Sequence, residues 1–440
     1  MKKRLLATLL SSTLVMTSLA GCSSKSENGD MVTELTKPIT IEMWHYMNGG
    51  QAEVLNEIIE DFNATNDKGI TVNAISQGSI VDLNKKVISA AQSNSLPAII
   101  NVYPDIATGL IEDKKLVNLS SFINDKNVGM ADEMDDFVDT FIEETSQWGE
   151  GEVYGLPMTK STEVLYVNKN MLESLGYTLE DLEDLTFEKL AEISNKAVTE
   201  LGVAGFGFDS SSNAFISSLK MNGLDFVDSK GTINVDNEWV REYMTFFQKQ
   251  AESGAFRIAG EDKFLSNPFV NQKMLCYQGS SAGYAYLNNG GAFEIAVVEV
   301  PVFEGKDKAV MQQGASLFVT NNVSAEAQYA AYEFVKFATN AENTAKFATA
   351  TGYLPVRKSA VETEIVKNIL NDETSLYSQV YNVAQKSLPY SYYTPAINNA
   401  QSARTVAQEK YEAFMSGSIK DVEVLVDDIV SQVQTSIGRN

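Results

Sequence analysis

Hydrophobic positions in the first part of the chain follow two periods, one typical of strands and one typical of helices. Residues 39–43 place Ile, Ile and Met at every second position, and residues 54–62 repeat apolar side chains at helical spacing. The same order returns in residues 70–74 and 83–91, and the apolar run 98–103 predicts a third strand. This order of strand, helix, strand, helix and strand predicts a parallel sheet wrapped by helices.

Ligands of such sheets bind beyond the carboxyl ends of the strands. The loops at that edge are 44–50, 76–82 and 103–108. A second set of elements comes after them, with strands expected at 165–167 and 295–300 and helices at 187–201, 238–251, 327–338 and 424–433. The class is therefore α/β, and 440 residues suffice for two domains of roughly 100–200 residues each.

The beginning of the chain has a pattern of its own. Basic residues at positions 2–4 precede an apolar run at 5–19, which predicts a secretory signal peptide over residues 1–21. The run is shorter than the ~20 residues that a bilayer-spanning helix needs. The segment Leu19-Ala20-Gly21-Cys22 resembles the lipobox of bacterial lipoproteins. That resemblance implies cleavage before Cys22, a lipid on its sulfur, and a mature chain anchored outside the cytoplasm, extracellular or periplasmic. An ordinary signal peptide with a chance cysteine is the alternative.

The polar residues 22–37 are expected to form a flexible tether. Composition narrows the possible functions of the protein. With 58 acidic and 34 basic residues the net charge is −24, which repels phosphate backbones, so no nucleic-acid partner is expected. Cys276 is the only cysteine after Cys22 and lies in an apolar run, where a buried thiol is expected.

His45 is the only histidine, so any histidine-dependent catalytic triad must use it. The sequence has no cluster with metal-ligand spacing and no nucleotide-binding glycine motif, and neither a metal nor a cofactor is expected. Paired carboxylates remain open as a chemistry, because so many acids always offer some pair.

Five segments, in this order, resemble the family 1 extracellular solute-binding proteins of ABC importers, and above all their glycerol-3-phosphate-binding and sugar-binding branches. The segments are 43–45, 156–169, 279–283, 314–319 and 351–356. The resemblance covers nearly the whole mature chain. It implies a hinged, two-lobed periplasmic-binding-protein-like fold of type II, with the ligand in the cleft between the lobes. Lobe closure would bury the ligand and present the closed form to a permease.

The same resemblance implies how the chain is divided. The amino lobe would hold 38–157 plus 312–370, and the carboxy lobe 158–311 plus 371–440. The protein would be a monomeric binding protein and not an enzyme. Its partners would be a small carbohydrate and the permease subunits of an importer.

By position, the resemblance places ligand contacts at Ser161, Ser280 or Ser281, Gly314 and Tyr353. Hydroxyl groups, a backbone amide and a phenol suit a polyol, because each offers a hydrogen bond to a ligand hydroxyl. For the serines and Tyr353, a structural role in turns or in the core is the alternative.

Five further residues are candidates. Trp44 and His45 close the first strand, where a cleft residue is expected. The alternatives are packing under the hinge for Trp44 and a structural role for His45. Asp82 and Asp105 are expected to accept hydrogen bonds from sugar hydroxyls, with a solvated surface carboxylate as the alternative. Phe215 falls near a tryptophan position of the family and is expected to form a stacking platform.

One departure from the family decides the predicted ligand. The family's cleft arginine falls near Pro395 or Ala396, and Arg404 lies farther along a predicted helix. Because arginine suits phosphate recognition, its absence there argues for a neutral sugar or oligosaccharide over glycerol-3-phosphate or a glycerophosphodiester. A surface glycosidase is a further alternative, which two carboxyls roughly 5–5.5 Å apart across the cleft would favour.

Overall fold

The computed structural model describes residues 31–438, so the predicted signal peptide and Cys22 lie outside the described residues. Within the predicted tether, residues 31–37 are packed against the body of the protein. Val32 and Leu35 contact its apolar core, and the backbone N–H and Oγ1 of Thr36 donate to Glu326 Oε1 at 3.0 and 2.6 Å. The prediction of a free tether is wrong for this part, because two apolar side chains in a polar segment suffice to dock it.

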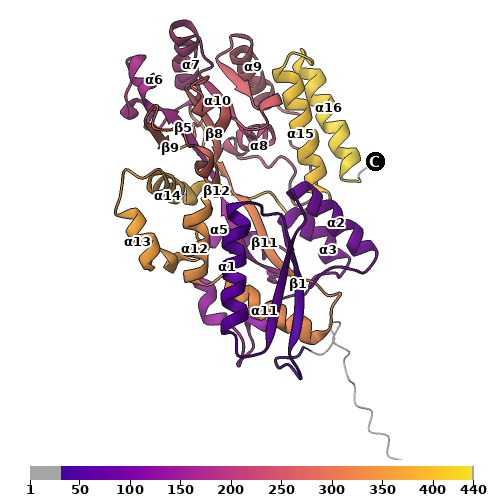
Figure 1. The fold of residues 1–440 in the computed structure, drawn as a ribbon. Coiled ribbons are helices and arrows are strands. Elements are labelled where there is room, and N and C mark those ends of the chain that lie inside the picture. The colour runs from indigo at the N-terminus through magenta and orange to yellow at the C-terminus, as the bar shows by residue number, and fades with distance from the viewer. Residues whose placement is uncertain (1–30, 439–440) are drawn as a thin grey trace, which may run out of the picture.

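Two five-stranded sheets form the two lobes seen in Figure 1, and they confirm the predicted α/β class with two lobes. The first sheet has the order β2-β1-β3-β11-β4, and the second β7-β6-β8-β5-β9. The strands of the first are β1 (Ile39–His45), β2 (Ile70–Ser76), β3 (Ile99–Val102), β4 (Gly155–Ser161) and β11 (Gln313–Val319). Those of the second are β5 (Glu163–Asn168), β6 (Phe206–Phe208), β7 (Phe256–Ile258), β8 (Cys276–Ser280) and β9 (Ile295–Val298).

Helices cover both sheets. Around the first lie α1 (Gly50–Thr65), α2 (Ile80–Gln92), α3 (Pro104–Glu112), α4 (Ser120–Ile123), α5 (Asp139–Glu144), α11 (Ala325–Ala338), α12 (Ala341–Thr351) and α13 (Glu364–Leu370). Around the second sheet lie α6 (Lys169–Ser174), α7 (Phe187–Leu201), α8 (Ser211–Met221), α9 (Glu238–Glu252), α10 (Ser266–Val270), α14 (Leu376–Ser387), α15 (Ala400–Met415) and α16 (Val422–Ser436). Within residues 31–438, no helix combines the length and the apolar character needed to cross a membrane.

The predicted strand–helix alternation forms the first lobe. β1 pairs in parallel with β2 and β3, and β11 joins β3 antiparallel. The predicted apolar face of α1 is buried through Leu55, Ile58, Ile59 and Phe62. In the second lobe, Phe187, Phe206 and Phe247 form an aromatic core with edge-on contacts, and Cys276 is buried there as predicted. The largest apolar cluster of each lobe surrounds its own sheet, and that of the first lobe also takes in Ala282 and Ala384 from second-lobe segments.

Within residues 31–438, the chain passes between the lobes at three places. β4 pairs with β11 as far as Ser161, and β5 begins at Glu163, so the first crossing is at Thr162. The predicted boundary at residue 157 is therefore four residues early, since the whole of β4 belongs to the first sheet. The second crossing is at Gln312, and the third lies between α13 and α14. Directly before the second crossing, the short strand β10 (Val310–Met311) pairs in parallel with β12 (Ser391–Tyr392).

Candidate functional site

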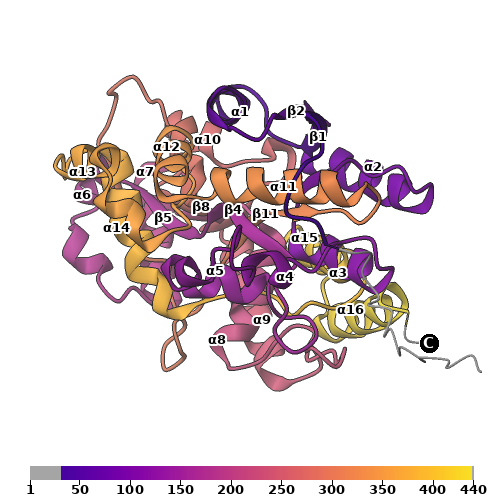
Figure 2. The same cartoon turned by 90° about the horizontal axis from the view of Figure 1, so that it is seen from below.

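A cavity of about 790 Å³ lies between the lobes. The first lobe lines it with α2, Tyr103 and α3, and the second lobe with the start of α8 and of α15. At this edge of the cavity, α15 of the second lobe lies next to α3 of the first (Figures 1 and 2). The residues that line the cavity with side-chain or backbone polar groups include Tyr103, Asp105, Glu144, Ser210, Ser212, Asn213, Gln312, Gln313, Gly314, Arg404 and Thr405. Of the predicted contacts, Asp105 and Gly314 are among them.

Gly314 fits this wall because it lacks a side chain. Its φ of +114° is in the region that favours glycine, and a Cβ atom there would lie 1.7 Å from the carbonyl oxygen of Thr159. The ladder between β11 and β4 shifts register next to it, between Ala315 and Ser316. The backbone at Gly314 therefore approaches β4 closely and stays open toward the cavity.

Arg404 also lines the cavity, so the cleft holds an arginine although the position that matches the family's arginine has none. Its Nη2 donates to Asn213 Oδ1 at 2.6 Å and to Ser212 Oγ at 3.4 Å. Within the described chain, no carboxylate forms an ion pair with this guanidinium. α15 begins directly after Asn399, whose φ is +60°, and this turn aims the first part of the helix at the cleft.

Glu163 lies directly behind the second lobe's part of the wall and is 2% exposed. Three amides converge on its carboxylate. Asn213 Nδ2 donates to Oε1 at 2.9 Å, Gln278 Nε2 to Oε2 at 2.9 Å, and Gln313 Nε2 to Oε1 at 3.5 Å. Burial raises the pKa of Glu163 to about 7, against the effect of these donors and of Arg404.

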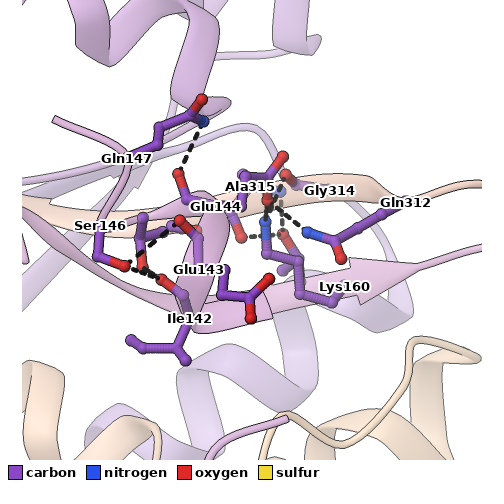
Figure 3. A network of polar contacts seen from close by, with 12 residues as sticks. Ile142, Glu143, Glu144, Ser146, Gln147, Lys160, Gln312, Gly314 and Ala315 are labelled. Atoms are coloured by element: carbon purple, nitrogen blue, oxygen red, sulfur yellow. Dashed lines mark hydrogen bonds and ion pairs between the residues drawn. The ribbon is translucent and has the colours of Figure 1, made fainter. Parts of the chain in front are cut away.

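Glu144 forms the counterpart on the first lobe (Figure 3). Its Oε2 accepts a short hydrogen bond from the fully buried Lys160 ammonium and a second one, of 2.8 Å, from Gln312 Nε2. Lys160 Nζ also donates to the carbonyl oxygen of Gly314 at 3.2 Å. Burial raises the pKa of Glu144, and the Lys160 ammonium opposes that rise. This network ties β4 to the crossing at Gln312.

The predicted serines and Tyr353 lie behind the cavity wall. Ser280 Oγ donates to Ser161 Oγ at 3.2 Å, and Ser161 Oγ donates to Gln313 Oε1 at 3.5 Å. Ser281 is fully buried, and its Oγ accepts from the backbone N–H of Thr162 at 3.3 Å. These serines join the two lobes at the first crossing and reach the cavity only through Gln313.

Tyr353 is 9% exposed, and its ring stacks on Phe347 with 5.7 Å between centroids. Its hydroxyl lies 3.3 Å from that of Tyr46, which in turn lies 3.0 Å from Thr159 Oγ1. Burial raises the pKa of both phenols well above the ordinary value, so they remain neutral donors. The structure thus places Tyr353 in a polar cluster under the first lobe's wall.

Four predicted contacts lie away from the cavity. His45 is 3% exposed, its Nδ1 accepts from the Met47 N–H at 3.2 Å, and burial lowers its pKa to about 4. Trp44 packs beside α2 and donates Nε1–H to Glu42. Both fit the alternative of packing in the lobe, because β1 is an inner strand.

Asp82 is exposed and forms a capping box with Ser79, whose Oγ donates to Asp82 Oδ2 at 2.7 Å. Hydrogen bonds from Ser79 lower the pKa of Asp82, so its role here is to cap α2. Phe215 is fully buried and packs edge-on against Phe226 and Tyr243. It is a core residue of the second lobe and forms no platform, because nearly every side chain of α8 is buried.

No group of three His, Cys, Asp or Glu side chains within residues 31–438 is arranged to hold a metal ion. Tyr103 lies in the loop 103–108 that the sequence analysis expects at the cleft. Sequence reasoning missed Glu144, Glu163, Asn213 and Gln313 as cleft or wall residues. Their types are common and carry no local motif, so no sequence signal marks them.

Comparison with known proteins gives consistent results. Residues 57–371 match the model of the family described as bacterial extracellular solute-binding protein. The sn-glycerol-3-phosphate-binding periplasmic protein UgpB of Rhizobium meliloti is 23% identical over 422 residues, which cover 90% of this chain and 94% of that protein.

Two solved structures share the fold. UgpB from Mycobacterium tuberculosis, in complex with glycerophosphocholine, has a TM-score of 0.78 at 20% identity, covering 92% of this chain and 99% of that one. The ABC substrate-binding protein Lmo0181 from Listeria monocytogenes, in complex with cycloalternan, has a TM-score of 0.78 at 16% identity, covering 92% and 100%.

Proposed function

Because this chain belongs to the bacterial extracellular solute-binding proteins, we propose that it captures a polyol phosphate ester, such as a glycerophosphodiester, for import. Members of the family are binding proteins of ABC importers and not enzymes. Lobe closure around the ligand is the step that a permease would recognise, since ligand binding shifts the equilibrium toward the closed form.

The observation that carries this proposal is Arg404. A guanidinium in a cleft without a carboxylate partner favours an anionic ligand, and its planar donors match two phosphate oxygens at once. Asn213 and Ser212 accept from Nη2, and Nη1 makes a long contact of 3.9 Å with Met311 Sδ, which leaves Nε–H and one N–H of Nη1 for the ligand. Gln313 and the open backbone at Gly314 supply polar groups for the glycerol hydroxyls.

A neutral sugar or oligosaccharide is the second candidate. The carboxylate of Asp105 and the amides of Asn213 and Gln313 suit sugar hydroxyls, and Lmo0181 is solved with cycloalternan. Against this, Tyr103 is the single aromatic residue among the described residues that line the cavity. Sugar sites commonly rely on aromatic faces for apolar contact.

Isothermal titration calorimetry of the mature chain with glycerol-3-phosphate, glycerophosphocholine, maltose and cycloalternan tests the proposal. We expect a phosphate ester to bind, and Arg404→Met to weaken that binding by at least about tenfold, since removing a charge-assisted pair costs over ~1.4 kcal/mol. Arg241→Met is the matched control, because Arg241 pairs with Glu423 and Asp236 on the surface. Binding of a neutral sugar alone, unaffected by Arg404→Met, would contradict the phosphate ester.

The membrane anchor is a separate proposal. Its support is the charged start, the apolar run and Cys22, which together imply lipidation of the mature chain at its first residue. In a bacterial host, Cys22→Ser should release the protein from the membrane fraction and abolish its labelling by a palmitate analogue. Retention of label in that variant would contradict the anchor.

A further inference from the structure

The carboxylate of Glu163 differs from the other groups at the cleft. It is buried, it does not contact the ligand cavity, and no lysine or arginine bonds to it directly. A buried carboxylate held only by neutral amides costs folding free energy, because desolvation is not balanced by an adjacent cation. Such a group needs a role that justifies this cost.

That role arises from the effect of a carboxylate on an amide. An ionised carboxylate only accepts hydrogen bonds, so Asn213 must turn its NH₂ group toward Glu163. Asn213 Oδ1 then points the opposite way, toward the guanidinium of Arg404, at 2.6 Å from Nη2. The carboxylate of Glu163 thus fixes the orientation of the Asn213 amide, and the amide oxygen of Asn213 in turn holds the guanidinium of Arg404.

Gln313 is oriented in the same way from the other lobe. Its Nε2 donates to Glu163 Oε1 at 3.5 Å across the junction between the sheets. Gln313 and Asn213 both line the cavity, so one carboxylate orients a polar group of each lobe.

We propose that Glu163 is a positioning residue for ligand capture, which holds Arg404 in the cleft through Asn213 and links anion binding to a proton on its own carboxyl. The inference rests on the proposed function, because it requires an anion at Arg404. An anion bound there stabilises the protonated form of Glu163 by like-charge repulsion, so affinity for the anion rises as pH falls through the titration of Glu163.

The charged and titratable groups around Glu163 are consistent with an affinity for the anion that rises as pH falls. Arg404 favours its ionised form, and Asp209 opposes it. The phenol of Tyr392 faces it from β12 and stays neutral, since burial raises its pKa. Asn213, Gln278 and Gln313, from α8, β8 and β11, are neutral at every pH used.

Two variants separate position from charge. In Glu163→Gln the side chain keeps its shape, and Gln278 can turn to accept the new N–H, because Gln278 Oε1 has no other partner within the described structure. Asn213 then keeps its orientation. In Glu163→Met the volume is similar, but the acceptor that orients Asn213 is lost. Glu333→Gln, at a buried glutamate on α11, is the control for a charge change elsewhere.

Calorimetric titration with glycerophosphocholine from about pH 6 to 8.5 provides the test, since a phosphodiester keeps its charge over this range. For the wild type we expect affinity to fall by up to about tenfold per pH unit across the titration, the limit for one linked proton. Glu163→Gln should lose this slope and bind more tightly than wild type at about pH 8. Glu163→Met should bind about tenfold more weakly than Glu163→Gln at every pH. Glu333→Gln should keep the wild-type slope.

The outcomes are distinct. Wild-type binding by Arg404→Met contradicts the proposed function, whereas a normal loss in that variant together with an unchanged slope in Glu163→Gln contradicts only the role of Glu163. Circular dichroism shows whether Glu163→Met is folded. Should it not fold, the slope in Glu163→Gln decides.

Discussion

The walls of the cleft contain two buried glutamates that are held in different ways. Glu144, on the first lobe, forms an ion pair with Lys160 and accepts one amide bond from Gln312. Glu163, on the second lobe, is held by three amides without an adjacent cation. Burial raises the pKa of both carboxyls, and a directly bonded cation, Lys160, opposes that rise at Glu144, whereas the groups in direct contact with Glu163 are neutral amides. The comparison shows that the ion pair holds Glu144 and Lys160 in place, whereas the neutral amides around Glu163 allow its carboxyl to gain or lose a proton near neutral pH.

The largest expected effect is the removal of the cation from the first site. Lys160→Met leaves Glu144 with its charge buried and unpaired, which should lower the free energy of unfolding by about 3–5 kcal/mol. Urea unfolding followed by circular dichroism measures the loss. The double variant Lys160→Met, Glu144→Met should recover much of it, because the orphaned charge is removed too. If Lys160→Met were as stable as wild type, the ion pair between Lys160 and Glu144 would not hold the structure together.

The second site should respond to pH instead. The carboxyl of Glu163 has a pKa of about 7 in the folded protein, against an ordinary value of 4.5. Because the folded state holds this proton more tightly, its contribution to stability is present below pH 4.5 and declines as pH rises to about 7. The shift corresponds to about 3 kcal/mol. Unfolding of wild type and Glu163→Gln at several pH values should show this difference, and parallel pH profiles would contradict it.

A smaller effect compares one amide at each site. Gln312→Leu and Gln278→Leu each remove one donor to a carboxylate and one buried oxygen that has no partner within the described residues. At about pH 8, Gln278→Leu should cost about 2 kcal/mol, the usual value for a bond to a charged group. Gln312→Leu should cost about 1 kcal/mol, because Lys160 still balances Glu144. Thermal unfolding at about pH 6 and about pH 8 checks that the cost of Gln278→Leu depends on pH and that the cost of Gln312→Leu does not.

The smallest effect concerns a carboxylate outside both sites. Asp82→Ala removes the capping partner of Ser79, so α2 should fray and the melting temperature should fall slightly. Ligand affinity should stay within about twofold of wild type, since Asp82 is exposed and does not line the cavity. A large loss of affinity would restore Asp82 as a ligand contact.

The sequence predicts the parts of the fold that depend on periodic patterns. The strands and helices of the first lobe result from alternating apolar positions, and the family resemblance predicts the crossing near Ser161 within four residues. The capping box at Asp82 has a sequence signal too, because Ser79 stands three residues before it. The place of Arg404 has none, because the turn at Asn399 sets the direction of α15. The position of Phe215 has no sequence signal either, because the pattern of a single helix does not distinguish an aromatic residue in the core from one at a cleft.

The chain crossings between the lobes have a mechanical consequence. The first two crossings lie side by side, since Thr162 Oγ1 donates to the carbonyl oxygen of Met311 at 3.3 Å, one residue before the crossing at Gln312. We therefore expect the two adjacent crossings to limit how far one lobe can twist against the other. An open form restricted in this way samples few orientations, so closure loses little rotational entropy, and more of the contact energy with the ligand remains as affinity.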